Sequence, residues 1–411
     1  MVNSCCFFLM HHSNKTNFWQ KNNCWWQHRV LFFSEFCDLF MFYLSAIEFV
    51  KKEATEMSNL SEKITMLHGA GGTVMHNLVK NYIVKYFGGL DNDAEVPLEA
   101  MDDAAVIGDI VFKSDSHAVK PIFFPGGDIG RLSVSGTVND ISAMGAMPYA
   151  LACGFILEEG LLIADFERIL VSMRETCIEA GVSIVTGDTK VVEKGSLGGL
   201  VMNLSGIGKR TPALESNIAV AKRYRKVASR WTLDSNLAIG DKIILTGTIG
   251  DHGLAVLSAQ QGLTFGSDIK SDVRPLNRML QRLFAEIGGV ISVKDPTRGG
   301  LADALNEWAE KSKVGILTYE DKVPIRRDVQ AACDMLGLDP LEVGNEGKYI
   351  IGVVTEKAEE ALEFLKHTEE GKNAQIIGEA TAEFKGVAMK TQIGGTRIIA
   401  RPIGDPVPRI C

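Results

Sequence analysis

Apolar residues recur along this chain with two alternating periods. The apolar residues of 166–178 lie three or four positions apart, and Gly181 follows them. This spacing predicts an amphipathic helix that ends at a glycine cap. Short apolar runs such as 182–185 and 290–293 are instead typical of buried strands.

The two patterns alternate through most of the chain, which predicts an α/β (α+β) fold. We expect helices at about 74–84, 129–144, 166–178, 251–260, 276–284, 301–308, 329–336 and 358–367, and strands at about 105–107, 110–114, 182–185, 199–208, 242–246, 290–293, 315–318, 349–354 and 375–378. The apolar rhythm is lost between Thr211 and Ser235. We therefore predict two stacked domains of mixed sheet and helices, at 57–220 and 221–396.

Residues 1–56 have a different composition from the rest of the chain. They are rich in Phe, Trp, Asn and Cys, and their apolar run 31–50 is interrupted by Glu35, Asp38 and Glu48. Charged residues are costly in hydrocarbon, so we do not expect a membrane-spanning helix. The segment also lacks the basic start and cleavage site of a signal peptide. We interpret it as a disordered extension or a misread start, with the working protein beginning near Met57.

The last fifteen residues, 397–411, predict a flexible tail. Pro402, Pro406 and Pro408 disfavour both helix and central strand. An extended chain of this length spans at most about 50 Å. The final residue is Cys411, so a mobile tail would let its sulfur visit more than one pocket.

Composition and charge exclude several classes of protein. The chain has 411 residues, of which 46% are apolar and 23% charged, and its formal net charge is -8. This balance is typical of a globular protein, and the negative charge argues against nucleic acid and membranes as partners. The eight cysteines show no disulfide framework and no metal-ligand spacing. We therefore expect a cytoplasmic protein.

Acidic residues stand at predicted strand ends and turns, and they are the first candidate site: Asp102, Asp103, Asp115, Asp140 and Asp188. Carboxylate oxygens suit Mg²⁺, which bridges proteins to phosphate oxygens, so the set predicts a metal–phosphate site. Taken singly, each acid is better explained as a turn cap or a solvated group. The two familiar phosphate-binding loops of nucleotide enzymes are absent from the sequence.

Three loops add further candidates. Residues 186–190, with the sequence Thr-Gly-Asp-Thr-Lys, follow a predicted strand and resemble a ligand loop. Lys190 in this loop either pairs with phosphate or is solvated. The turn at 293–301 either holds an anion at a helix start or is an ordinary turn capped by Asp295 or Thr297. Glu346, in the loop 344–348, is either a surface acid or a general base.

Taken together, several stretches resemble one family. They are 101–107, 115–117, 124–130, 136–140, 186–190, 294–300, 345–348 and the ending Pro-Arg-Ile-Cys at 408–411. The chain resembles the HypE family of [NiFe]-hydrogenase maturation proteins, within the PurM-like, aminoimidazole ribonucleotide synthetase superfamily. The likeness covers 64–411, and its most specific part is the ending. Two parts of the chain differ from the family pattern. One is Met101, where glycine is more usual before the paired acids, and the other is the first 56 residues.

The resemblance implies two PurM-like domains, the first of which binds ATP, and an ATP-dependent carbamoyl dehydratase. In that family a carboxamide on the terminal cysteine is dehydrated to a thiocyanate, which supplies the cyanide of the hydrogenase iron. It implies a homodimer, a HypF-type carbamoyltransferase partner and an iron-carrying HypC–HypD-type complex.

The resemblance also implies roles for individual residues. Asp102, Asp103, Asp115 and Asp140 would hold Mg²⁺ and ATP, with Asn139, Thr186, Gly187 and Asp188 also in the nucleotide site. Asp188 and Lys190 would orient the phosphates, Glu346 would remove protons and Cys411 would carry the group.

Two alternatives stay open. One is another ATP-dependent kinase or ligase of the same superfamily, acting on selenide, thiamine phosphate or a formamidine precursor, which would not need Cys411. The other is a non-catalytic scaffold that binds nucleotide and docks maturation partners through its tail.

Overall fold

The helix α4 (Ile129–Ala143) is the element around which the two halves of the protein pack. Asp128 caps its start, because its Oδ1 accepts hydrogen bonds from the backbone N–H groups of Gly130 and Arg131 at 2.8 and 3.0 Å. Every residue of α4 except Arg131 is buried. Its small residues allow this, since a Cβ on Gly130 would lie only 2.6 Å from the carbonyl oxygen of Ile169.

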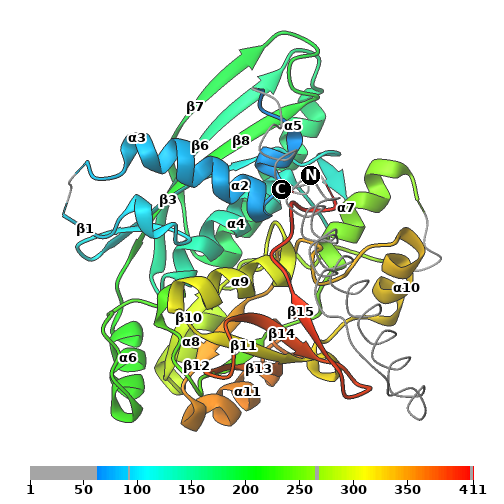
Figure 1. Cartoon of the computed structure of the whole chain (residues 1–411). Coiled ribbons are helices and arrows are strands. Elements are labelled where there is room, and N and C mark those ends of the chain that lie inside the picture. The colour runs from blue at the N-terminus through cyan, green and yellow to red at the C-terminus, as the bar shows by residue number, and fades with distance from the viewer. Residues whose placement is uncertain (1–62, 91–92, 264–267, 408–410) are drawn as a thin grey trace, which may run out of the picture. The chain divides into compact units, whose positions relative to one another are not determined.

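The structure is a computed structural model that describes residues 63–90, 93–263, 268–407 and 411 (Figure 1). Besides short 3-10 turns, the other helices within these residues are α2 (Gly72–Leu78), the π-helical η2 (Val79–Val84), α3 (Lys85–Phe87), α5 (Ile163–Ala180), α6 (Pro212–Tyr224), α7 (Asp251–Gln261), α8 (Asn277–Glu286), α9 (Gly300–Ser312), α10 (Arg327–Leu336) and α11 (Ala358–Lys366). Residues 1–56, predicted as an extension, lie outside the described residues.

The strands of the described residues form two large sheets and one small hairpin. The first half contributes β1 (Ala94–Val96), β2 (Ala105–Ile107), β3 (Ile110–His117), β4 (Phe123–Phe124), β5 (Gly127–Asp128), β6 (Met147–Glu158), β7 (Ile184–Val192) and β8 (Leu200–Lys209). The second half contributes β9 (Lys242–Leu245), β10 (Val290–Lys294), β11 (Gly315–Tyr319), β12 (Ile350–Val353), β13 (Gln375–Thr381), β14 (Gly386–Lys390) and β15 (Thr396–Ile399).

Both large sheets are mixed. The six-stranded sheet has the order β1-β2-β3-β8-β6-β7, and only its β6–β7 pair is parallel. The seven-stranded sheet has the order β10-β12-β9-β13-β11-β14-β15, and its β11–β14 pair is parallel. Figure 1 shows α4 between the two sheets, and one continuous apolar core contains residues of both halves. The predicted α/β fold of mixed sheets and helices is therefore confirmed.

The structure agrees with the sequence where apolar periodicity is strong. Helix α5 ends at Gly181, whose φ of 76° is left-handed, so the predicted glycine cap is confirmed. One expectation was wrong: the predicted ligand loop 186–190 is the middle of strand β7. The stretch between Thr211 and Ser235, where we predicted the domain boundary, contains helix α6, which spans residues 220 and 221.

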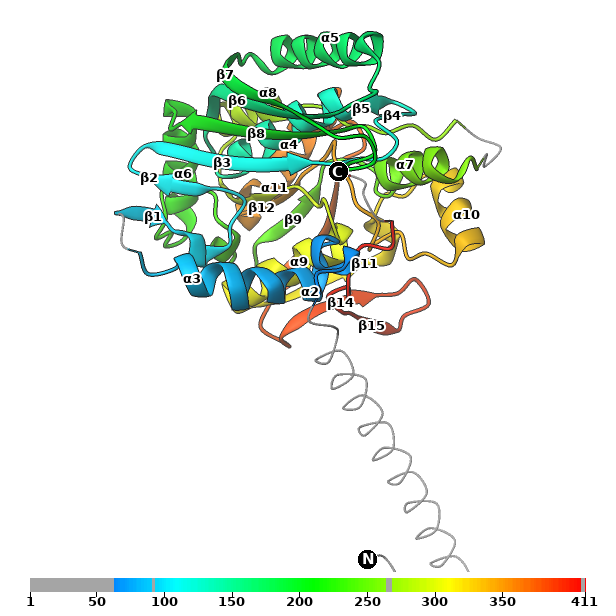
Figure 2. The same cartoon turned by 90° about the horizontal axis from the view of Figure 1, so that it is seen from above.

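The chain beyond β15 turns back across the molecule. Strand β15 takes up the first three residues of the predicted tail, 397–399. Figure 2 shows the end of the chain near the centre of the view, beside the end of β3. Among the helices of the described residues, none is long and apolar enough to cross a bilayer; the apolar run 31–50 lies outside them.

Candidate active site

A cavity of about 520 Å³ lies where the two halves of the protein meet, and both halves line it. The first half contributes Asp102 and Asp103 from the segment before β2, Asp115 and His117 from β3, and Asp140 from α4. The second half contributes Lys294 and Asp295 at the end of β10, Arg298 just before α9, and Glu346 from the loop before β12. Cys411 lines the same cavity.

Three carboxylates from three separate elements converge in this cavity. One oxygen from each of Asp103, Asp140 and Asp295 lies within 4.8 Å of the other two. Within the described residues, Asp103 Oδ2 and Asp295 Oδ2 are buried without a hydrogen-bond partner. Burial raises the pKa of Asp140 to about 7, and burial together with Asp140 and Asp103 raises that of Asp295 well above its usual value. Oxygen donors arranged this way fit a hard divalent cation.

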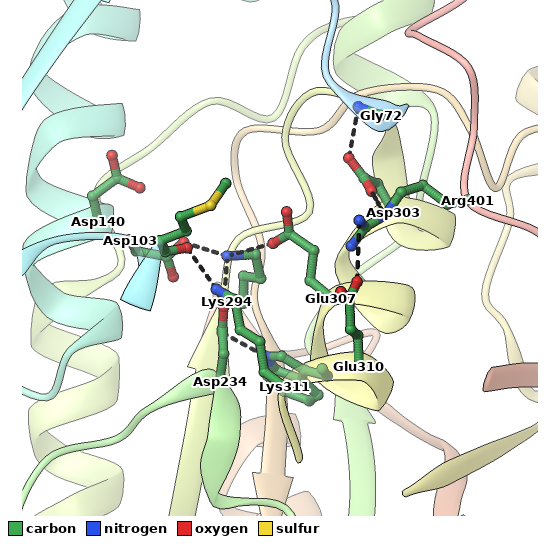
Figure 3. Close-up of polar contacts among 12 residues, drawn as sticks. Gly72, Asp103, Asp140, Asp234, Lys294, Asp303, Glu307, Glu310, Lys311 and Arg401 are labelled. Carbon is green, nitrogen blue, oxygen red and sulfur yellow. Dashed lines mark hydrogen bonds and ion pairs between the residues drawn. The ribbon is translucent and has the colours of Figure 1, made fainter. Parts of the chain in front are cut away.

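Lys294 lies beside this carboxylate cluster and neutralises part of it. Its Nζ contacts a carboxylate oxygen of Asp103 and lies 3.1 Å from Glu307 Oε2 and 3.2 Å from Asp234 Oδ2. Figure 3 shows Lys294 between Asp103 and Glu307. The carboxylates raise the pKa of Lys294 well above its usual value although burial opposes this, so the lysine stays charged.

Asp234 is a structural partner of two lysines. It is fully buried, and Lys311 Nζ lies 2.7 Å from its Oδ2. Trp308 donates its indole N–H to Asp234 Oδ1 at 2.7 Å. Burial opposes ionisation, but Lys294 and Lys311 outweigh it and lower the pKa of Asp234 to about 2. One oxygen of Asp234 lies within 4.8 Å of an oxygen of Asp102 and of Asp103. However, Oδ1 of Asp234 already accepts from Trp308, and Oδ2 already pairs with the two lysines.

Asp140 and Asp115 each lie beside a basic side chain. Lys113 Nζ lies 2.7 Å from Asp140 Oδ2, and His117 Nε2 lies 3.3 Å from Asp115 Oδ2. Burial opposes ionisation of Asp115, but His117, Lys113 and Arg298 lower its pKa below the usual value. Burial lowers the pKa of His117, which leaves the imidazole neutral at pH 7.

Cys411 and Arg298 are electrostatic neighbours in the cavity. Negative charge on Cys411, when it is present, is the largest contributor to the raised pKa of Arg298, followed after burial by Asp115 and Glu346. Burial raises the pKa of the Cys411 thiol to about 12, although Arg298 acts in the opposite direction. The sulfur in this position is therefore a neutral thiol beside a permanent positive charge.

Glu346 is held in the cavity by its loop. Asn345 fixes the loop, because its Oδ1 accepts a hydrogen bond from Gly250 N at 2.8 Å and its Nδ2 donates to Pro296 O at 3.0 Å. Glu346 Oε2 is buried and, among the described residues, has no hydrogen-bond partner. Burial, Asp115 and Asp140 raise the pKa of Glu346 well above its usual value. This is the environment of a carboxylate that accepts a proton readily.

The structure brings together six of the predicted site residues and separates the others from them. Asp102, Asp103, Asp115, Asp140, Glu346 and Cys411 line the cavity. Asn139 does not line it: its side chain donates to Arg274 O and Glu346 O and accepts from Leu276 N. Thr186, Gly187, Asp188 and Lys190 lie exposed on β7, the edge strand of the first sheet, and do not line the cavity of their own chain.

Sequence reasoning missed part of this network. Asp234 lies in the stretch that we treated as a domain boundary, and Glu307 and Lys311 lie on α9 without any local motif. Asp295 was considered only as a turn cap. One signal was available: Lys294 ends an apolar strand pattern, and a lysine in such a run requires a buried acidic partner.

Comparisons with known proteins identify the class of this fold and site. Residues 101–209 match the family of AIR synthase related proteins, N-terminal domain, and residues 238–390 match its C-terminal domain. A protein of Methanocaldococcus jannaschii named for hydrogenase expression and formation is 49% identical over 353 residues, which cover 85% of this chain and 100% of that protein. The carbamoyl dehydratase HypE of Azotobacter vinelandii is 42% identical, with 85% and 97% covered.

Solved structures agree with this classification. HypE in a HypE–HypF complex superposes with a TM-score of 0.71 at 44% identity, covering 79% of this chain and 99% of that chain. HypE in complex with ATP superposes with a TM-score of 0.67 at 39% identity, covering 85% of this chain and 100% of that chain. The protein is an AIR synthase related, PurM-like protein. Within that class it belongs to the HypE family, as the sequence predicted.

Proposed function

We propose that this chain is an ATP-dependent carbamoyl dehydratase of [NiFe]-hydrogenase maturation, acting on a carboxamide carried by its own terminal cysteine. The observation that carries the proposal is the position of Cys411, which lines the same cavity as Asp103, Asp140, Asp295 and Glu346. The names of the relatives given above support it.

The chemistry requires an oxygen and two protons to leave the carboxamide. The carboxamide oxygen attacks the γ-phosphate of ATP, ADP leaves, and one N–H proton is lost, which gives an S-bound imidate phosphate. Loss of the second N–H proton then expels inorganic phosphate and leaves a thiocyanate. Glu346 is our candidate base for these protons, because its raised pKa makes its carboxylate a stronger base once it is ionised. Arg298 lines the same cavity and would stabilise the negative charge that develops on the phosphate as it leaves.

The protonation state of the Cys411 sulfur distinguishes carbamoyl transfer from the later dehydration. A thiol with a pKa of about 12 is a poor nucleophile at neutral pH. Accepting a carbamoyl group requires nucleophilic sulfur, whereas dehydration acts on a sulfur that is already acylated. The docked position of Cys411 therefore suits dehydration, and we place carbamoyl transfer in a state in which the tail is outside the cavity.

We propose Mg²⁺ as the cofactor that accompanies ATP. Asp103 and Asp140, joined by Asp295, would hold it, and the cation would neutralise phosphate charge when bound. Asp102 and Asp115 line the neighbouring walls and complete the acidic surface for the nucleotide. Asp115 is not part of the three-carboxylate cluster, so its role is toward nucleotide or substrate and not as a ligand of that same cation.

We propose a homodimer in which β7 reaches the partner's cavity. Lys190 and Asp188 are exposed on an edge strand and do not line the cavity of their own chain. Unpaired edge strands with exposed apolar residues, here Val185 and Val191, are templates for association. A second copy would place Thr186, Gly187, Asp188 and Lys190 against the phosphates, while Asn139 acts by holding the loop of Glu346.

The partners that we propose follow from the reaction. A HypF-type carbamoyltransferase supplies the carbamoyl group, by analogy with the solved HypE–HypF complex. An iron-carrying HypC–HypD-type complex in the cytoplasm receives the cyanide.

The variant Cys411→Ala tests the proposed carrier. We expect it to bind ATP with unchanged affinity and to form no ADP coupled to carbamoyl transfer, and Cys411→Ser to behave the same. Cyanide or thiocyanate formed by Cys411→Ala would refute the proposal.

Mixed dimers test the role of Lys190. Neither Cys411→Ala nor Lys190→Ala homodimers should turn over, whereas a mixture of the two should recover activity if Lys190 acts on the partner subunit. A purely monomeric protein, or no recovery in mixed dimers, would contradict this arrangement.

A further inference from the structure

The tail residues 401–407 are docked between the glycine loop 69–73 and the start of α9. The tail carbonyl of Pro402 accepts hydrogen bonds from Thr73 N at 2.8 Å and Thr73 Oγ1 at 3.2 Å. The carbonyl of Ile403 accepts from Val74 N at 3.3 Å. These two backbone N–H groups belong to the first turn of α2, which has no partner within its own helix for them. The tail therefore completes the start of α2.

Asp405 is the residue that joins the tail to both neighbours. Its backbone N–H donates to the carbonyl of Ala70 in the glycine loop. Its Oδ2 accepts from Gly299 N at 3.3 Å, at the start of α9, and its Oδ1 accepts from Val407 N at 2.8 Å. The side chain is buried, and Val407 beside it is fully buried. One carboxylate thus fixes the tail against α9 and holds the backbone from Asp405 to Val407 in place.

The glycines of the loop are required by this docking. A Cβ on Gly72, whose φ is +65°, would lie 2.4 Å from the carbonyl oxygen of Pro402. A Cβ on Gly71, whose φ is +70°, would lie 2.8 Å from the backbone of Arg298. Gly72 N also donates to Asp303 Oδ2 at 2.8 Å, and Arg401 Nε lies 3.0 Å from the other oxygen of Asp303 (Figure 3). Loop, tail and α9 therefore fit together only with glycine at these positions.

We propose that Asp405 is the positioning residue that sets how far Cys411 enters the cavity. Cys411 lies six positions after Asp405 in the chain, so the sulfur stays within about 20 Å of the anchor. Asp405 acts by accepting hydrogen bonds from the backbone N–H groups of Val407 and Gly299. Gly299 directly follows Arg298, which is the cationic neighbour of the sulfur. The anchor and the charge beside the sulfur are therefore held by the same turn. This inference rests on the proposed role of Cys411 as the carrier.

Thiol labelling tests the anchor without any turnover. The native full-length chain is treated with a maleimide, quenched, and digested after glutamate, and the peptide 384–411 is analysed by mass spectrometry. Cys411 is the only cysteine in this peptide. We expect Asp405→Ala and Gly72→Ala each to increase the labelling rate of Cys411 by at least about tenfold. In Asp405→Ala two buried N–H groups lose their acceptor, and in Gly72→Ala the added Cβ displaces the tail. Asp321→Ala, at a half-exposed aspartate on η5 (Glu320–Lys322), should label within about twofold of wild type.

Turnover of chain already carboxamidated on Cys411 tests the positioning. Asp405→Ala should lower kcat for dehydration by at least about tenfold with an unchanged KM for ATP, and Asp405→Glu should restore part of the rate. Inserting one glycine between Asp405 and Cys411, after Val407, should lower kcat similarly. Inserting one between Gly394 and Gly395, before β15, should not.

The outcomes separate the two claims. Wild-type labelling rates in Asp405→Ala, or an unchanged kcat in that variant, would overturn the positioning role. Faster labelling in Asp405→Ala together with no dehydration by the wild-type chain would leave the anchor standing and refute the proposed function.

Discussion

Removing the charge of Lys294 while keeping its bulk tests the ion network beneath the cavity. The substitution Lys294→Met leaves Asp103, Asp234 and Glu307 without their shared cation. Only 11% of the Lys294 side chain is exposed, and 9% and 0% of those of Asp103 and Asp234, so little solvent reaches the uncompensated carboxylates.

The expected loss of stability follows from this burial. Breaking a buried pair by removing one partner costs about 3–5 kcal/mol, because the remaining charge is buried and unpaired. Lys311 still neutralises Asp234. Most of the lost free energy of unfolding therefore comes from the unpaired carboxylate of Asp103. Mg²⁺ should recover part of it, since a divalent cation can neutralise Asp103 together with Asp140 and Asp295.

Urea unfolding followed by far-ultraviolet circular dichroism, with and without Mg²⁺, measures both effects. The matched control is Lys242→Met, which breaks a pair with Glu379 in which both side chains are 30% exposed and which should cost about 0–1 kcal/mol. A loss below about 1 kcal/mol for Lys294→Met, or equal losses for the two variants, would refute the reasoning.

Three other predictions concern the base, the metal site and the fold. Glu346→Gln should lower dehydration by about 100-fold or more and leave ATP affinity within about twofold; loss of ATP affinity instead would assign Glu346 to nucleotide binding. Burial raises the pKa of Asp140 to about 7, so below that pH a bound proton competes with the cation. Mg²⁺ affinity by calorimetry should therefore fall by up to about tenfold per pH unit below 7, and a flat profile would contradict the assignment. Gly181→Ala should lower the free energy of unfolding by about 1 kcal/mol, because residue 181 has a left-handed φ of 76° at the end of α5; an unchanged urea midpoint would show that this cap is unimportant.

The elements predicted correctly are those whose signal is local. Helix α5 and its cap, and the alternation of strands and helices after residue 240, follow from periodic apolar residues and glycine, which act over a few positions. Residues 186–190 predict a ligand loop, because glycine permits close backbone approach and Asp188 and Lys190 bring opposite charges together, but these residues lie within strand β7. The glycine is needed there, since a Cβ would lie 2.1 Å from the carbonyl oxygen of Cys153 on β6, and an exposed edge strand tolerates the aspartate.

The carboxylates of the site were visible in the sequence, but their pairing was not. Asp103 and Lys294 are separated by 191 residues, and Asp234 and Lys311 by 77. No local pattern records such contacts, because they depend on how the two sheets pack around α4. The docked tail is a similar case: the prolines predict an extended segment, while the hydrogen bonds of Asp405 depend on the distant glycine loop at Ala70 and on Gly299 at the start of α9.

The mass of the peptide 384–411 after a single turnover shows whether the group on Cys411 is the one that is dehydrated. Starting from the chain with a carboxamide on Cys411, an adduct of about +43 Da, ATP should cause loss of about 18 Da as the thiocyanate forms. A tail that keeps its full adduct while ATP is consumed would contradict the account.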